Sequence, residues 1–209
     1  YLLLLRLYAE HQLPRLPSTS CLALYQTSFE VLNIYQRRFS LMEQRSEHAD
    51  EEAVLFRNES CLHVLELLNH LSSKDFSFSE DCAEQTNANF EREVAAVLLC
   101  GLQVIIPVLS TESLRNFPTT SERFFSFLAF MLSSYVVDIA RWVNNLPNNE
   151  GPQMLHEIML RLHCGSGAVE APTARLALQV SAFCSCVTEL VLAPWLTLIL
   201  NRSHSFFLS

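Results

Sequence analysis

Cysteine and histidine are the residues of this sequence whose side chains could hold a metal ion. His163 and Cys164 precede Cys184 and Cys186, and thiolate and imidazole groups are the ligands that zinc prefers. The Cys-x-Cys spacing differs from the Cys-x2-Cys of zinc sites, and on a helix it places the two thiols about 200° apart. We therefore expect buried free thiols here, with no metal and no cofactor.

Other patterns that could support catalysis are weak or missing. His63 and His70, like His156 and His163, are spaced by seven residues and would share a helix face. No carboxylate pair accompanies them on that face, so we interpret them as ordinary surface histidines. The sequence has no G-x-S-x-G elbow, P-loop, H-E-x-x-H or Rossmann glycine pattern, and it contains only four glycines. These features predict a protein that is not an enzyme.

The acidic side chains are the most unevenly distributed chemical feature. Residues 43–93 contain 13 acidic and four basic residues, a local charge of −9, whereas the remaining 158 residues sum to +1. Such a segment either binds a basic partner or consists of solvated loops, and both interpretations stay open. We expect two acidic loops, near 43–57 and 73–90. The candidate partner-binding surface consists of Asp50, Glu51, Glu52, Glu80 and Asp81.

Charge and hydropathy exclude several classes of partner. A net charge of −8 lacks the basic footprint that nucleic-acid binding requires. The longest uncharged run, residues 94–111, includes Gln103 and Pro107 and has no flanking Lys/Arg cluster, so we expect no membrane partner. Seven scattered cysteines, five of them in apolar surroundings, favour a reducing compartment over a disulfide framework.

The elements that would position these residues are predicted to be helices. Half of the residues are hydrophobic, while four Gly and eight Pro give too little punctuation for a β-sandwich. Prolines 107, 118, 152 and 172 mark helix boundaries. Thr119-x-x-Glu122 has the spacing of a capping box, and residues 142–149 read as a turn. The expected helices cover 1–12, 21–42, 58–71, 90–106, 121–137, 151–164 and a stretch after 171.

The spacing between successive predicted helices is roughly that of stacked helical hairpins. Leu62, Leu65, Leu68 and Leu71, widened by neighbouring apolar residues, suit a helix that is packed on more than one side. We expect an all-α fold, an α-solenoid of HEAT-type antiparallel hairpins. Residues 1–209 would form a single stretch of such repeats, part of a longer chain because the sequence begins at Tyr1 inside an apolar helix.

Several stretches, in the same order along the chain, resemble a known family. Residues 97–110, which read VLLCGLQVIIPVLS, are followed by the LRNFP turn of residues 114–118. Upstream, residues 3–8 (LLLRLY) and 65–76 (LELLNHLSSKDF) occur in the same order, and a weaker block follows from Met159 to Leu178. Together these motifs resemble the exportins of the importin-β superfamily of nuclear transport receptors. The acidic insert at 43–53 and the 165–173 loop have no clear counterpart in that family.

The resemblance implies a function in transport. A receptor of this family is built of HEAT repeats, binds protein cargo, contacts nuclear pore proteins and shuttles between nucleus and cytoplasm under control of the Ran GTPase. The main Ran-binding repeats of the family are N-terminal and match nothing in this sequence, so that site is expected outside it. The alternative is a general HEAT-type interaction scaffold without a transport role.

Overall fold

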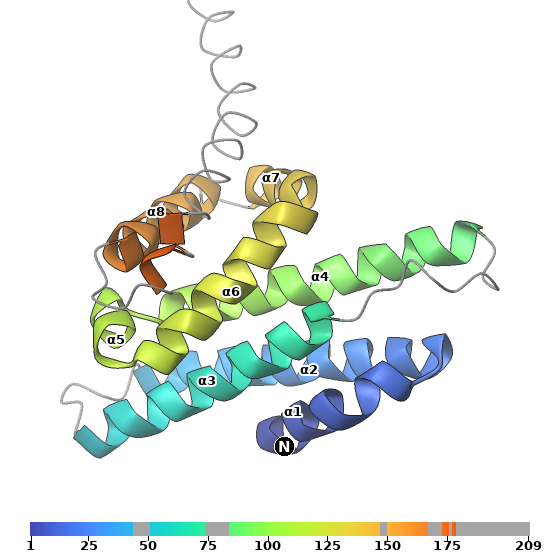
Figure 1. The fold of residues 1–209 in the computed structure, drawn as a ribbon, viewed down its shortest axis with the longest axis horizontal. Helices are drawn as coiled ribbons and strands as arrows, with labels where there is room; N and C mark the ends of the chain where they lie inside the picture. The colour runs from blue at the N-terminus through green and yellow to red at the C-terminus, as the bar shows by residue number, and fades with distance from the viewer. Residues whose placement is uncertain (44–50, 74–83, 147–149, 167–172, 176, 179–209) are drawn as a thin grey trace, which may run out of the picture.

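The described part of the chain is built from helices alone (Figure 1). The computed structural model describes residues 1–43, 51–73, 84–146, 150–166, 173–175 and 177–178. The elements are α1 (Leu2–Gln12), the 3-10 turn η1 (Leu13–Arg15), α2 (Ser18–Glu43), α3 (Glu51–Ser73), α4 (Glu84–Val108), α5 (Thr111–Asn116), α6 (Pro118–Ser134), α7 (Val136–Asn145) and α8 (Glu150–Ser166). The all-α prediction is confirmed for these residues, among which no strand occurs.

The long helices pack in alternation rather than in simple succession. Helix α3 lies between α1 and α6 and makes extensive contact with both, while α2 packs mainly against α4. Figure 1 shows α1, α3 and α6 nearer the viewer, with α2 and α4 behind them. Helices α7 and α8 pack against each other, and α8 also contacts the short helix α5. The result is two layers of helices with the apolar core between them.

The wide apolar stripe of α3 packs against more than one neighbouring helix. Its buried side chains include Val64, Leu65, Leu67, Leu68 and Leu71, which cover well over a third of the helix circumference. Because neighbours lie on both sides of α3, each part of this stripe has a partner. The prediction of a helix packed on more than one side is confirmed.

The two predicted acidic loops were too long. Residues 51–57 form the first turns of α3, and residues 84–89 form the first turns of α4. Carboxylates near a helix N-terminus stabilise the unpaired N–H groups and the positive end of the macrodipole, so an acidic run can begin a helix. The remainders of the two predicted loops, 44–50 and 74–83, lie outside the described residues.

Three local predictions between residues 110 and 149 were wrong. The capping box fails because Pro118 occupies the first position of α6 and Phe117 is its N-cap, which places Thr119 inside the helix. The cap that does form is Ser110, whose hydroxyl accepts a hydrogen bond from the Ser113 N–H at 3.0 Å at the start of the unpredicted α5. The helix expected over 121–137 breaks at Tyr135, and α7 continues to Asn145, through the first half of the turn predicted over 142–149. Residues 147–149 of that turn lie outside the described residues.

Candidate binding site

The structure places only part of the predicted acidic surface. Glu52 is exposed on the first turns of α3, and Glu51 begins that helix. Asp50, Glu80 and Asp81 lie outside the described residues. The described residues therefore neither assemble the five carboxylates into one surface nor separate them, and the proposed acidic surface stays a prediction.

The first turns of α3 carry an exposed face that the sequence analysis missed. Glu52, Leu55, Phe56 and Glu59 follow one another at i, i+3, i+4 and i+7 and are all exposed. We call these four residues the α3 face. The spacing was visible in the sequence, but the assignment of residues 43–57 to a loop hid it.

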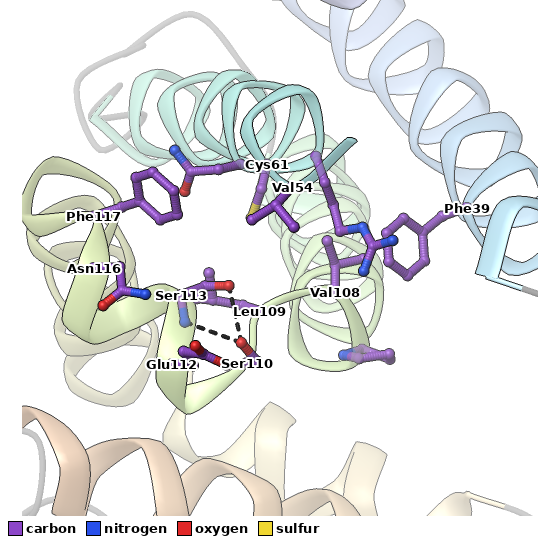
Figure 2. A pocket seen from close by; sticks show the side chains of 13 residues that line it. Phe39, Val54, Cys61, Val108, Leu109, Ser110, Glu112, Ser113, Asn116 and Phe117 are labelled. Atoms are coloured by element: carbon purple, nitrogen blue, oxygen red, sulfur yellow. Dashed lines mark hydrogen bonds between the residues drawn. The ribbon is translucent and has the colours of Figure 1, made fainter. Parts of the chain in front are cut away.

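A cavity of about 260 Å³ opens on the other side of the same turns (Figure 2). Its walls come from α2, α3, the end of α4 and α5, and they are mixed in polarity. Apolar groups of Val54, Val108 and Leu109 face polar groups of Asn116 and Glu112. The cavity lies just below the roughly 300–1,000 Å³ typical of sites for small organic ligands, so its size suits a single anchoring side chain better than a cofactor.

Two side chains at this cavity have well-defined environments. The Arg57 guanidinium lies 5.5 Å from the centre of the Phe39 ring, in a cation–π contact between α3 and α2. Burial raises the pKa of the Cys61 thiol to about 12. Because the thiolate is the nucleophilic form of cysteine, the Cys61 thiol is expected to be unreactive at neutral pH.

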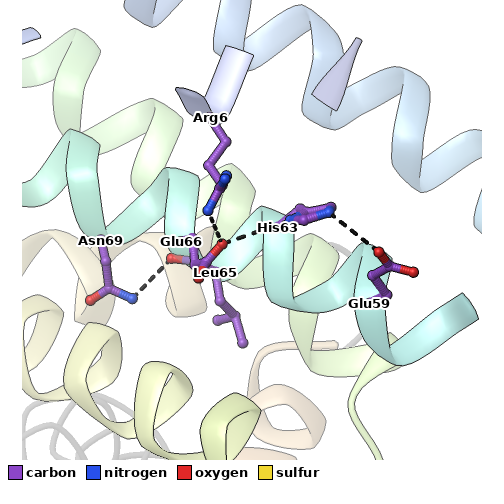
Figure 3. Close-up of polar contacts among 6 residues, drawn as sticks. All are labelled: Arg6, Glu59, His63, Leu65, Glu66 and Asn69. Atoms are coloured by element: carbon purple, nitrogen blue, oxygen red, sulfur yellow. Dashed lines mark hydrogen bonds and ion pairs between the residues drawn. The ribbon is translucent and has the colours of Figure 1, made fainter. Parts of the chain in front are cut away.

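An ion pair joins α1 to α3 (Figure 3). Arg6 Nη1 lies 2.6 Å from Glu66 Oε2, and both side chains are mostly buried. His63 lies between two carboxylates of its own helix, with Nδ1 3.7 Å from Glu66 and Nε2 4.0 Å from Glu59. Two turns beyond His63, burial lowers the pKa of His70. The expectation that no carboxylate pair accompanies these histidines is wrong for His63, which lies between Glu59 and Glu66, and both His63 and His70 are partly buried. His156 and His163 are exposed on α8, as the surface interpretation predicted.

A buried arginine secures the end of α4. Arg161 of α8 donates from Nε to the Leu109 carbonyl at 2.7 Å and from Nη2 to the Ile106 carbonyl at 2.5 Å. Its third nitrogen, Nη1, bonds Glu157. The last carbonyls of a helix have no partner within the helix, and a cation at that end also complements the macrodipole. Arg161 therefore caps α4 from 52 residues away.

The described residues contain neither a metal-binding group nor a single helix that could span a membrane. No three His, Cys, Asp or Glu side chains among them come together as ligands. Helices α6 and α7 together are long and apolar enough to cross a membrane, but they meet at an angle of 95°. Cys21, Cys61, Cys100 and Cys164 are free thiols, while Cys184 and Cys186 of the weak zinc candidate fall outside the described residues.

Comparisons with known proteins return nothing: no family model, no curated protein and no solved structure matches this chain.

Proposed function

We propose that this chain is a segment of an exportin-4-like nuclear transport receptor that binds protein cargo and catalyses no reaction. The observation that supports the proposal best is the alternate packing of the helices. Helix α3 contacts the helices on either side of it in one layer while α2 contacts α4 in the other, which is how stacked helical hairpins are arranged. The ordered sequence motifs add the resemblance to the importin-β superfamily.

In this proposal the chain works as a surface rather than as an active site. Stacked hairpins give an extended face that can bind a large partner through many modest contacts. The acidic stretch, with a charge of −9 over residues 43–93, would draw basic cargo toward that face. Ran would bind elsewhere in the receptor and control the release of cargo. The receptor would shuttle between nucleus and cytoplasm and contact pore proteins in passage.

The test is whether cargo binding depends on the nucleotide state of Ran. The complete gene product would be immobilised and offered a nuclear extract together with Ran bound either to GDP or to a non-hydrolysable GTP analogue. A transport receptor is expected to capture a set of proteins in only one of the two states. Capture that is identical in both states would contradict the transport role and leave the general HEAT-type scaffold as the function.

A further inference from the structure

The α3 face combines two exposed apolar side chains with two carboxylates on one side of a helix. Leu55 is 54% exposed and Phe56 is 59% exposed, and the side chain of Glu59 is 70% exposed. Glu52 precedes Leu55 by one turn. At about 100° per residue the four positions fall within an arc of about 100°, so one partner element could contact all of them.

No other described helix covers this face. Helix α1 packs along the later turns of α3, where Arg6 reaches Glu66. Helices α4 and α6 contact the opposite side, which carries the buried residues. In Figure 1 the first turns of α3 extend beyond the ends of the neighbouring helices. Leu55 and Phe56 are thus unpartnered within the part of the chain that the structure describes.

The charges of the face define the chemistry of its partner. Within the described part of the chain, neither Glu52 nor Glu59 forms an ion pair with a lysine or arginine; the imidazole of His63 lies 4.0 Å from Glu59. We propose that the α3 face binds an amphipathic helical segment of another protein, with apolar side chains over Leu55 and Phe56 and lysine or arginine opposite the two carboxylates. Apolar contact would provide most of the affinity, and the charges would select the partner.

A second copy of this chain is a poor occupant of the same surface. In a two-fold dimer the face would meet itself, because an isologous interface uses the same residues on both subunits. Glu52 and Glu59 of one subunit would then confront the same carboxylates of the other, and like charges brought together at an interface disfavour association. A basic partner removes this repulsion.

Two designed peptides test the charge requirement. Both are labelled helices with leucines at i, i+3, i+4 and i+7; the basic probe carries lysines beside them and the acidic probe carries glutamates. Binding to the 209-residue chain is followed by fluorescence anisotropy. The basic probe is expected to bind with a dissociation constant that rises with salt, and the acidic probe is expected to bind at least about tenfold more weakly. Equal binding of the two probes would overturn the proposal.

Paired variants locate the binding. Glu52→Gln/Glu59→Gln should weaken the basic probe by about three- to tenfold at low salt. Leu55→Ser/Phe56→Ser should weaken it by at least about tenfold, because both side chains are buried on binding. The matched controls, Glu30→Gln/Glu122→Gln and Met159→Ser/Leu160→Ser, change exposed residues on other helices and should bind within about twofold of the wild type.

The remaining outcomes are decisive as well. All variants change exposed side chains, so unchanged circular dichroism is expected and separates a binding defect from misfolding. Control variants that lose binding as strongly as the α3-face variants would overturn the proposal, as would self-association that Leu55→Ser/Phe56→Ser abolishes. The inference rests on the chain being a binding module, as in the proposed function. The two remain distinguishable, because Ran-dependent cargo capture without probe binding refutes only the α3 face, and probe binding without Ran dependence refutes only the transport role.

Discussion

At the scale of single residues, polar side chains that bond to a neighbouring helix hold the helices in register. Tyr25 of α2 donates its hydroxyl to the Leu71 carbonyl near the end of α3 at 2.5 Å, Asn69 of α3 donates to the Arg123 carbonyl of α6 at 3.0 Å, and Arg161 caps α4. Each joins a side chain of one helix to a backbone carbonyl of another. The carbonyls of Leu71, Leu109 and Ile106 are in buried hydrogen bonds and would cost free energy without a partner, so the Tyr25 and Arg161 contacts both specify position and contribute stability.

Replacing Arg161 with methionine is expected to lower the free energy of unfolding by about 3 kcal/mol, because the Ile106 and Leu109 carbonyls lose their partner at a buried site. The measurement is urea denaturation followed by circular dichroism. Arg141→Met is the matched control, since Arg141 pairs with Asp138 at the surface, where such pairs contribute little. An equal loss of unfolding free energy in the two variants would show that the hydrogen bonds of Arg161 to the Ile106 and Leu109 carbonyls add no stability beyond that of a surface arginine.

The buried thiol of Cys61 predicts a loss of stability in alkaline solution. Its folded pKa of about 12 lies above the unfolded value of 9.0, so the unfolded chain ionises first. The stabilisation is complete below pH 9 and falls by up to about 1.4 kcal/mol per pH unit above it. Cys61→Val should flatten the decline of unfolding free energy between pH 9 and 11. An unchanged slope in the variant would assign the alkaline loss to other groups, such as Cys100 and Tyr35, whose pKa values burial also raises.

At the scale of elements, the corner between α7 and α8 depends on a residue without a side chain. A Cβ added to Gly151 would lie 2.1 Å from the backbone carbonyl oxygen of Val143, so α8 could not begin where it does. At Gly101 the added atom would meet only the end of the Leu68 side chain, at 2.3 Å. A side chain can rotate away from such a clash, whereas a backbone carbonyl can move only with its helix.

Gly151→Ala is therefore expected to destabilise the protein by about 2–3 kcal/mol, and Gly101→Ala by clearly less, because only the first change displaces backbone. Thermal unfolding of both variants provides the comparison. If Gly101→Ala proved the more harmful, the packing of α3 against α4 would have to be tighter than the α7–α8 corner.

The elements also show what could be inferred from the sequence. Leucine periodicity predicted the body of α3, and Leu65, Leu68 and Leu71 are buried as expected, while Leu62 is half-buried. Pro118 marked the start of α6 correctly. The capping role predicted for the Thr119 hydroxyl is wrong, because Pro118 occupies the first helical position and Thr119 therefore lies inside the helix. Acidic residues were interpreted as loop because charge indicates exposure, and an exposed residue can equally occupy the first turn of a helix.

The contacts that join distant helices could not be predicted in the same way. Nothing in the neighbourhood of Arg161 indicates that its partners lie 52 and 55 residues away, because local periodicity carries no information on which helices meet. The cavity beside Cys61 could not be predicted for the same reason, since its walls come from four elements, among them segments that are distant in the sequence. The α3 face differs from both. It is a local pattern that the sequence contains, and only the wrong loop assignment concealed it.

At the scale of the whole molecule, the uneven charge predicts how association rates respond to salt. If the chain belongs to a cargo receptor, as proposed, changing Asp50, Glu51, Glu52, Glu80 and Asp81 together to Asn or Gln in the complete gene product should slow the association of a basic partner and flatten its salt dependence, with helicity unchanged. Stopped-flow association at several ionic strengths measures both effects. Equal rates for wild type and variant at low salt would show that these carboxylates are only solvated surface charges that do not attract the partner.

The alternate packing of the helices also determines how the molecule yields to force. Helices α1 and α2 make no extensive contact with α7 or α8, and α3, α4 and α6 connect the two ends. Tension applied through α1 and α8 therefore loads the outer contacts first, without having to break the whole core at once. In an optical trap the described helices should open in separate steps, because removing the helices at one end leaves the contacts between the helices at the other end intact. The force–extension curve would then show several discrete extensions, each corresponding to a partly opened state.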